Sequence, residues 1–466
     1  MPDPVAGRRP TVVVIGASAS GLFAATALAG FADVTLLERD RLPDGPTARR
    51  GVPQSRHAHL VWSGGVRAFD ALVPGVIEDA VARGGRLVHI MGELVSRAPN
   101  AVWLRRFTAS DHHILVCSRD LLDHVLRTRV LADPRITLRQ ETAAVGLSGT
   151  AAQVTGVRLR TGDTETSLDA DLVVDASGRG SRMPRWLTDL GLPRVPEREV
   201  DAGIAYATRL FHAPGRTAGL RFPVVNVQAT PARPPGRGGI ILPVEGDRWI
   251  VTLSGTRGGE PTSDPDGFLD FALGLGDPLI GELLRNAEPI GDVVTTRSTA
   301  NSRRYYEKMK SWPDGVVVLG DAVAGYNPVY GHGLTVAAQG ALAVRTVLDT
   351  APLTAPGIAR RLQRAAAGPV GAAWDLAVGQ DVFYPGAAST PPTALEKYLA
   401  RFLDLAFSAS ARNPRALAAM LDVMSLEKPA TRLLSPDMLI PMLFGPRKPY
   451  LDEAPLTRAE RDSVTS

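Results

Sequence analysis

Cysteine is almost absent from this sequence of 466 residues, in which Cys117 is the only one. A single thiol forms no internal disulfide and no thiolate metal cluster, so a disulfide-stapled fold and a cysteine-ligated metal site are both excluded. We therefore expect a protein of the reducing cytoplasm that holds no metal. Cys117 itself stands in the apolar stretch HILVCSRD and is expected to be a small buried side chain.

Long apolar runs and blocks of one charge are missing as well. Outside the glycine-rich first unit no run of about 18 apolar residues occurs, which argues against a membrane-spanning helix. The formal charge is only +4 and no basic block stands out, so nucleic acid is not an expected partner. The late segment PDMLIPMLFGP is apolar but short and interrupted by prolines, and we expect it to dock on the core rather than on a bilayer surface.

The first 40 residues contain a pattern with chemical meaning. Residues 12–15 are a continuous β-branched run, typical of a strand buried on both faces, and Gly16 ends it. Gly21 opens an Ala- and Leu-rich helix, and a second apolar run ends at Glu38, 22 residues after Gly16. This is the spacing of a dinucleotide-binding βαβ unit, in which the helix N-terminus receives a pyrophosphate and the acid accepts hydrogen bonds from ribose hydroxyls.

Two features of this unit complicate that interpretation. Arg8, Arg9 and the small residues 27–29 imitate a twin-arginine export signal, but a signal has no reason to be followed by a strand that ends in an acid. Ser18 stands where the fingerprint has its middle glycine. Serine is the next smallest polar choice and its hydroxyl could donate to a phosphate oxygen, so the pattern is weakened but not broken.

The strand-then-turn pattern recurs twice further along the chain. Residues 172–174 are a short apolar run that ends in Asp175. Residues 316–319 run into Asp321, after which a glycine-containing loop leads to a long helix that begins near Leu334. An isolated glycine turn is weak evidence, but three in this order are specific.

The remaining segments complete an α/β fold class. We expect short strands at 87–95 and 102–107, a helix with Ser118 as its N-cap, and a hairpin turn at 245–248 within a β-rich stretch. The predicted organisation is a doubly wound, Rossmann-like cofactor domain, an inserted mixed or antiparallel sheet domain for substrate, and a C-terminal helical region. These parts are expected at 1–85, 110–195 and 290–350, at 86–109 and 196–289, and at 351–466 respectively.

The three turns and the inserted sheet resemble the FAD-dependent monooxygenases of the p-hydroxybenzoate-hydroxylase fold over roughly residues 10–350. Five segments narrow this to a resemblance with squalene-epoxidase-like bacterial epoxidases, which act on polyene intermediates of polyether biosynthesis. The segments are RRGVPQSRHAHLVWSGG, VCSRDLLD, YATRLF, RWIVTLSGTRGGEP and GDAVAGYNPVYGHG.

The resemblance implies a non-covalent FAD and a set of residues around it. The residues implied to bind FAD are Gly16, Ser18, Ala19, Ser20, Gly21, Glu38, Arg39, Arg50, Arg119, Val145, Gly320, Asp321, Gly331, Gly333 and Leu334. Without the resemblance, Arg50 and Arg119 read as ordinary surface or ion-pair residues. The loop with Pro328, Gly331 and His332 would lie beside the flavin, although loop packing is an equally good interpretation of His332.

No protein nucleophile is expected, because in this family the reduced flavin reacts with O₂ to a C4a-hydroperoxide whose distal oxygen an alkene attacks. The substrate pocket would be walled by Tyr206, Trp249, Tyr326 and Asn327, although large aromatics in strands are more often plain core. The expected partner is a small lipophilic substrate from polyketide or terpenoid metabolism, free or bound to a carrier protein.

One departure concerns the electron source. Single-component aromatic hydroxylases carry an Asp-Gly pair where this sequence has Ser177-Gly178, which favours NAD(P)H acting through a separate flavin reductase. Three other functions stay open: an aromatic or polyketide ring hydroxylase, a flavin-dependent reductase of isoprenoid double bonds, and a non-enzymatic lipid binder. The W-x-W-x-I-P signature of flavin halogenases is absent.

Overall fold

A five-stranded parallel sheet forms the centre of the chain in the computed structural model, which describes residues 8–49, 51–108, 110–217, 221–297, 299–445 and 448–465. The strand order is β19-β11-β1-β2-β7, and every neighbouring pair runs parallel. Their bounds are β1 Thr11–Ile15, β2 Asp33–Leu37, β7 Ile136–Arg139, β11 Leu172–Asp175 and β19 Val316–Val318.

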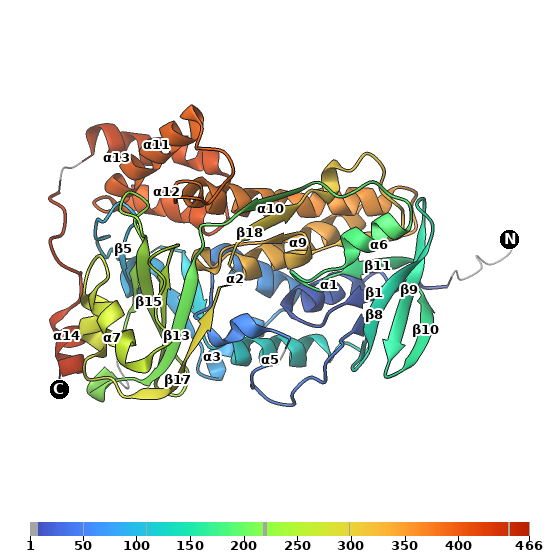
Figure 1. Cartoon of the computed structure of the whole chain (residues 1–466), viewed down its shortest axis with the longest axis horizontal. Coiled ribbons are helices and arrows are strands. Elements are labelled where there is room, and N and C mark those ends of the chain that lie inside the picture. Colours follow the sequence, from blue (N-terminus) through green and yellow to red (C-terminus); the bar gives the residue numbers. More distant parts are fainter. Residues whose placement is uncertain are drawn as a thin grey trace.

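Both faces of this sheet are covered, which is why its strands read as continuous apolar runs (Figure 1). Val12 and Val14 pack with helices α1, α2, α5 and α9, whereas Val13 and Ile15 pack with α6 and α10 on the other face. These helices are α1 Ala19–Ala29, α2 Ser63–Leu72, α5 Arg119–Val130, α6 Met183–Asp189, α9 Gly333–Leu348 and α10 Ile358–Asp381. The predicted doubly wound domain is confirmed. The predicted cap is confirmed too, since the Ser118 side chain accepts a hydrogen bond from Leu121 N–H at the start of α5.

A second, six-stranded sheet stands beside the first, in the order β17-β13-β16-β15-β14-β5. It is antiparallel except for the β14–β5 pair. The predicted turn at 245–248 joins β15 and β16 as a hairpin. The strands are β5 Leu94–Arg97, β13 Ala205–His212, β14 Val224–Val227, β15 Arg237–Val244, β16 Arg248–Gly255 and β17 Pro289–Thr296. Helices α7 Pro265–Leu273, α8 Leu279–Leu284 and α14 Arg458–Thr465 lie on one side of it.

Three small sheets accompany the two large ones. They are β3 Leu60–Val61, β6 His113–Val116 and β4 Arg86–His89; β8 Ala143–Gly149, β9 Val154–Thr161 and β10 Thr164–Asp169; and β12 Glu197–Val200, β18 Asn301–Arg304 and β20 Ala324–Gly325. The short helices are α3 Val76–Ala82, α4 Ile90–Glu93, η1 Pro53–Arg56, η2 Gly215–Thr217, η3 Tyr306–Lys308, η4 Gly320–Ala322, η5 Pro328–Tyr330 and η6 Ala430–Leu434.

Two expected strands differ from the structure. The segment 87–95 is not one strand, because α4 separates β4 from β5 and the two strands join different sheets. The segment 102–107 forms no strand, and Trp103 makes only an isolated bridge to Arg97.

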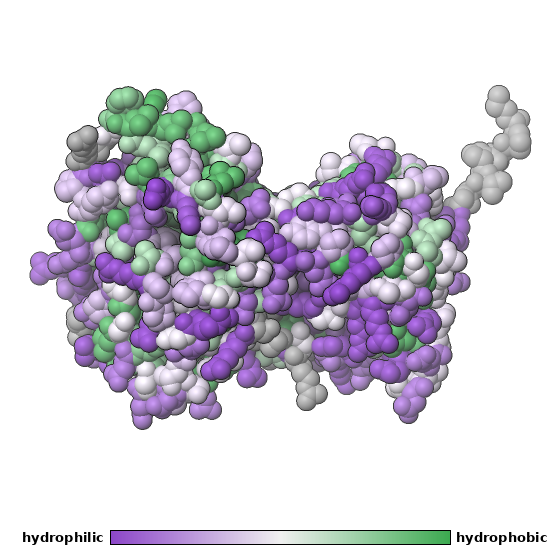
Figure 2. Space-filling model, turned by 45° about the horizontal axis from the view of Figure 1, so that its top comes forward, coloured by the Kyte–Doolittle hydropathy of each residue, from purple (hydrophilic) through white to green (hydrophobic). Residues whose placement is uncertain are grey.

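Three C-terminal helices, α11 Ala394–Ser410, α12 Pro414–Met424 and α13 Pro436–Phe444, cap the end of the six-stranded sheet (Figure 1). The expected docking of the PDMLIPMLFGP segment is only partly right, since Met438 is buried but Ile440, Leu443 and Phe444 are exposed. Figure 2 shows apolar residues gathered on this lobe. No helix in the described part of the chain has the length and apolarity needed to cross a membrane.

Candidate functional site

Two adjoining cavities lie within the described part of the chain, one at the parallel sheet and one at the six-stranded sheet. The first, of about 620 Å³, opens at the carboxyl ends of β1, β11 and β19, where open α/β sheets bind their ligands. The second, of about 180 Å³, lies between the six-stranded sheet and helices α10, α11 and α12. The residues that line both cavities are Ala58, His59, Leu60, Pro328 and Gly331.

The turn between β1 and α1 is shaped for close approach of a ligand. Gly16 has φ +99°, and a Cβ there would lie 2.8 Å from the carbonyl oxygen of Ala176. A Cβ on Gly21 would lie 1.7 Å from the carbonyl oxygen of Gly16, so only glycine fits. Ser18 is the N-cap of α1 but its side chain makes no capping hydrogen bond. The first amides of α1 therefore remain available to an anion in the cavity.

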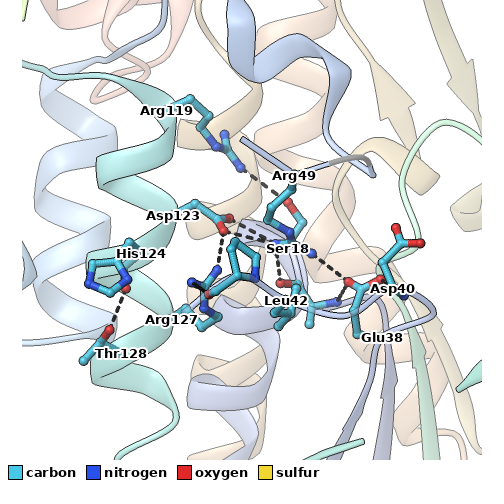
Figure 3. A network of polar contacts seen from close by, with 12 residues as sticks. Ser18, Glu38, Asp40, Leu42, Arg49, Arg119, Asp123, His124, Arg127 and Thr128 are labelled. Carbon is cyan, nitrogen blue, oxygen red and sulfur yellow. Dashed lines mark hydrogen bonds and ion pairs between the residues drawn. The ribbon is translucent and has the colours of Figure 1, made fainter. Parts of the chain in front are cut away.

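Glu38 directly follows β2 beside this turn and is held by several donors (Figure 3). Its Oε2 accepts from the Ala17 amide at 3.2 Å and from the Arg49 guanidinium at 2.8 Å, and its Oε1 accepts from the Asp40 amide at 3.1 Å. These donors fix the carboxylate at the cavity wall, where lone pairs of Oε1 remain for further donors.

Arg49 is a buried residue that the sequence interpretation missed. Its guanidinium bridges Glu38 and Asp123, at 2.8 and 3.1 Å, and Arg127 pairs with Asp123 at 3.0 Å. Its neighbour Arg50, the residue predicted to bind FAD, lies outside the described residues. The sequence did carry a signal for the part of this ion-pair network that lies on α5. Arg119, Asp123 and Arg127 are spaced at i, i+4 and i+8, which places all three on one face of a helix.

Arg119 reaches the same cavity from α5. One of its terminal nitrogens lies 3.4 Å from the Ser18 hydroxyl, while its buried Nε has no hydrogen-bond partner. The Ser20 hydroxyl is also buried and unpartnered at this wall. Buried polar groups without partners are rare in folded proteins, so this pair indicates a bound ligand with acceptor oxygens. A diphosphate at the helix N-terminus fits both groups.

Asp321 faces the cavity from the end of β19. Burial raises the pKa of its carboxyl, and the guanidinium groups of Arg179, whose Nε lies 3.7 Å away, and Arg119 oppose that rise. Gly320 directly before it has φ +61°, and a Cβ there would lie 2.3 Å from the Ser20 hydroxyl. A carboxylate at this place suits the hydroxyls of a ribityl chain.

The start of α9 forms the far wall of the first cavity. Gly331 has φ +66°, and His332 is the N-cap of α9 without a capping side-chain bond, so the first amides of the helix stay open. His332 Nε2 lies 2.9 Å from the carbonyl oxygen of Met424, to which it donates. Burial lowers the pKa of His332 to about 4, so the ring is neutral. Open amides at a helix N-terminus stabilise negative charge on a bound ring system.

The second cavity is apolar with polar groups near its junction with the first. Aliphatic and Met side chains from several elements, α12 among them, line much of its wall, together with polar side chains of the sheet such as Asn226 and Thr252. The polar side chains near the junction include His57, His59, Tyr206, Tyr330 and Asp381. His57 Nδ1 lies 2.8 Å from the Thr208 hydroxyl, and burial lowers the pKa of both His57 and His59 to about 4.

Most of the predicted site residues lie on the wall of the first cavity. Gly16, Ser18, Ala19, Ser20, Glu38, Arg39, Arg119, Val145, Asp321, Tyr326, Asn327, Pro328, Gly331, His332, Gly333 and Leu334 line the first cavity. Gly21 and Gly320 lie behind its wall, and Tyr206 lines the second cavity.

Two corrections concern the predicted substrate pocket: Tyr326 and Asn327 line the first cavity and not the second, and Trp249 lines neither. Its ring is fully buried on the opposite face of the six-stranded sheet, where it contacts Phe222 at 4.8 Å between ring centroids. Side chains alternate along a strand, so Thr252 and Ser254 face the cavity while Trp249 faces away. Asp381, which contributes to the junction, was missed because it stands alone in a helix that carries no motif.

One group of metal-ligating residue types occurs in the described chain, formed by His112, Asp422 and Glu427. Lys428 and Arg432 already pair with the Asp422 carboxylate at 3.0 and 2.7 Å. These cations neutralise the charge that a metal ion would need, and the group lines neither cavity.

Comparison with known proteins agrees with this geometry. A family model described as FAD binding domain matches residues 9–355. The chain is 32% identical over 423 residues to the protein Rv3254 of Mycobacterium tuberculosis, covering 84% of this chain and 88% of that protein. It is 27% identical over 369 residues to a kynurenine 3-monooxygenase of Salinispora tropica, covering 76% and 75%.

Among solved structures, the flavin-dependent brominase Bmp2 superposes with a TM-score of 0.63 over 89% of this chain and 93% of that chain, at 15% identity. This likeness shows a shared fold. The matched family model covers the strands and turns that carry the first cavity. The chain therefore belongs to the FAD binding domain family, of FAD-dependent monooxygenase type, and has the p-hydroxybenzoate-hydroxylase fold.

Proposed function

We propose that this protein is an FAD-dependent monooxygenase that transfers one oxygen atom from O₂ to a C=C bond of a lipophilic polyene, polyketide or terpenoid, giving an epoxide. The observation that carries the proposal is the apolar cavity that joins the FAD cavity at Pro328 and Gly331. The apolar cavity would hold the alkene, and its junction with the FAD cavity would bring that alkene to the flavin.

The residues of this chain have defined tasks in the proposal. Arg119, Ser20 and the first amides of α1 would hold the diphosphate, Glu38 the adenosine ribose and Asp321 the ribityl chain. When bound and reduced, FAD supplies the activation of O₂. The apolar wall would exclude water from the junction, and the open amides at the start of α9 would stabilise negative charge on a bound ring system.

The electron source belongs to the same proposal. Ser177 donates its hydroxyl to Asp175 Oδ1 at 2.6 Å and so closes the β11 turn on itself. We propose that NAD(P)H reduces the flavin through a separate reductase. Purified protein should be yellow, its flavin should be reduced slowly by NAD(P)H alone, and turnover should rise strongly when a flavin reductase is added.

Ring hydroxylation is the second candidate, and the 27% identity to a kynurenine 3-monooxygenase favours it. Stopped-flow absorbance of the flavin separates the two. Rapid reduction by NADPH that a phenolic or anilinic substrate accelerates, followed by a ring-hydroxylated product, would replace epoxidation by hydroxylation.

A further inference from the structure

Three polar side chains at the junction of the two cavities, those of His59, Tyr206 and Tyr330, offer hydrogen-bond acceptors to a ligand. His59 is the first of them. Its Nδ1 lies 2.7 Å from the carbonyl oxygen of His57, so that nitrogen carries the proton and donates it. Nε2 is then an unprotonated acceptor, and it makes no hydrogen bond with any residue that the structure describes. Because the ring is neutral at pH 7, this arrangement holds under ordinary conditions.

Tyr206 is the second acceptor, because its own proton is already in use. The Val329 amide donates to Asn327 Oδ1 at 3.2 Å, and Asn327 Nδ2 donates to Asp381 at 3.0 Å, which fixes the orientation of the Asn327 amide. The Tyr206 hydroxyl, 2.6 Å from Asn327 Oδ1, must therefore donate to it. The Tyr206 hydroxyl then has no proton left for a ligand, and its oxygen, which lies beside the Val329 amide, offers a ligand only an acceptor lone pair.

Tyr330 is the third hydrogen-bond acceptor at the junction. Its hydroxyl lies 2.6 Å from Asp381 Oδ1, and burial beside that carboxylate holds its pKa far above the ordinary value, so Tyr330 keeps its proton and donates it. Asp381 also accepts from the side-chain amides of Asn301 and Asn327. Within the described chain no cation forms an ion pair with Asp381, although the residue is only 1% exposed. Burial raises the pKa of the Asp381 carboxyl, and the hydrogen bonds from Tyr330, Asn327 and Asn301 oppose that rise.

We propose that the substrate is an apolar molecule that carries a hydrogen-bond donor, an O–H or an N–H group, at the end that enters this junction. The inference rests on the proposed function and names its substrate class. An alcohol, enol, phenol or amine would satisfy His59 and the tyrosine oxygens. A plain hydrocarbon or an ether would leave these acceptors without partners.

The test uses three probes with the same apolar body: 2-naphthol, 2-naphthylamine and 2-methoxynaphthalene. Binding to the oxidised, FAD-loaded protein is followed by the change in flavin absorbance, without reductant. We expect the naphthol, the naphthylamine or both to bind about tenfold tighter than the ether, in line with one or two hydrogen bonds. Whichever of the naphthol and the naphthylamine binds more tightly indicates whether the substrate carries an O–H or an N–H group. Equal affinity of all three probes would overturn the inference.

Variants of the junction residues test whether these side chains cause the preference for a probe with a hydrogen-bond donor. In His59→Phe and in Tyr206→Phe the advantage of the donor probe should fall to about threefold or less, while ether binding changes little. Tyr398→Phe on the exposed face of α11 is the matched control and should keep the full preference. If His59→Phe does not fold, Tyr206→Phe carries the test alone. An equal loss for all probes, together with weaker FAD binding, would mean that these side chains serve the cofactor and would overturn the inference.

The binding measurement is independent of turnover. A donor preference in a protein that yields no oxygenated product would contradict the proposed function and leave this inference standing. Oxygenation of both an ether and an alcohol, with equal binding constants for the two, would overturn this inference and leave the proposed function standing.

Discussion

Arg49 should be among the most costly residues to lose, because it joins two buried carboxylates at the cofactor wall. We expect Arg49→Leu to lower the free energy of unfolding by about 3 kcal/mol, since breaking a buried ion pair leaves an uncompensated charge. FAD affinity should fall with it, because Glu38 would lose its strongest donor. Urea unfolding and FAD titration of the same preparation measure both effects. The control is Arg185→Leu, whose weak pair with Asp189 is exposed, and a loss no larger than that of the control would contradict the account.

Single residues also show how far sequence reasoning reaches. Ser18 is the weak point of the fingerprint, and the structure gives it φ −92° and ψ −178°, an extended conformation open to any residue. A serine is tolerated there because no positive φ is needed, whereas Gly16 and Gly21 have no substitute. The prediction for Trp249 is wrong because the face of a strand residue depends on its parity relative to the neighbouring strand. Phe211 on β13 pairs with Trp249 on β16, which places both on the face away from Tyr206.

At the scale of elements, the contact between β1 and α1 decides whether the cofactor site forms. Gly21→Ala should abolish FAD binding and destabilise the protein, because its Cβ would lie 1.7 Å from a backbone oxygen. Gly30→Ala at the end of the same helix is the matched control, since Gly30 has φ −64° and nothing within 4 Å of its Cβ position. That variant should be neutral or slightly more stable. Flavin content after purification and thermal unfolding measure both, and a normal flavin content in Gly21→Ala would refute the assignment.

Elements with a strong local pattern could be predicted, and elements fixed by distant contacts could not. The parallel strands, the Ser118 cap and the 245–248 hairpin each carry their signal within a few residues. The junction depends instead on Asp381, Asn301 and Asn327, which come together from α10, β18 and the loop before η5. No local spacing relates them, so only the folded chain reveals their network.

At the scale of the whole molecule, buried histidines make stability depend on pH. His332 has a pKa of about 4 in the folded protein against about 6.5 when unfolded, so the unfolded state binds the proton first as the pH falls. Its contribution is present above pH 6.5 and is lost between pH 6.5 and 4, on the order of 3 kcal/mol in all. His332→Gln should therefore show a smaller loss of unfolding free energy between pH 7 and pH 5 than the parent protein.

The comparison must be between variant and parent, because buried carboxyls act in the opposite sense. Burial raises the pKa of Asp175 and Asp381, so these groups favour the folded state as the pH falls. Urea unfolding of parent and variant at pH 5 and pH 7, at equal FAD saturation, isolates the contribution of His332 to the free energy of unfolding. Parallel curves for parent and variant would show that His332 carries a proton in the folded state.

Oxygen transfer by the assembled site is the central claim, and ¹⁸O₂ labelling tests it most directly. The FAD-loaded protein, a flavin reductase and NAD(P)H are incubated under ¹⁸O₂ with a polyunsaturated alcohol such as farnesol, and the products are analysed by mass spectrometry. The account predicts a product that contains one ¹⁸O atom and opens in acid to a diol, as an epoxide does. A product without ¹⁸O, or one that has gained hydrogen instead of oxygen, would contradict it.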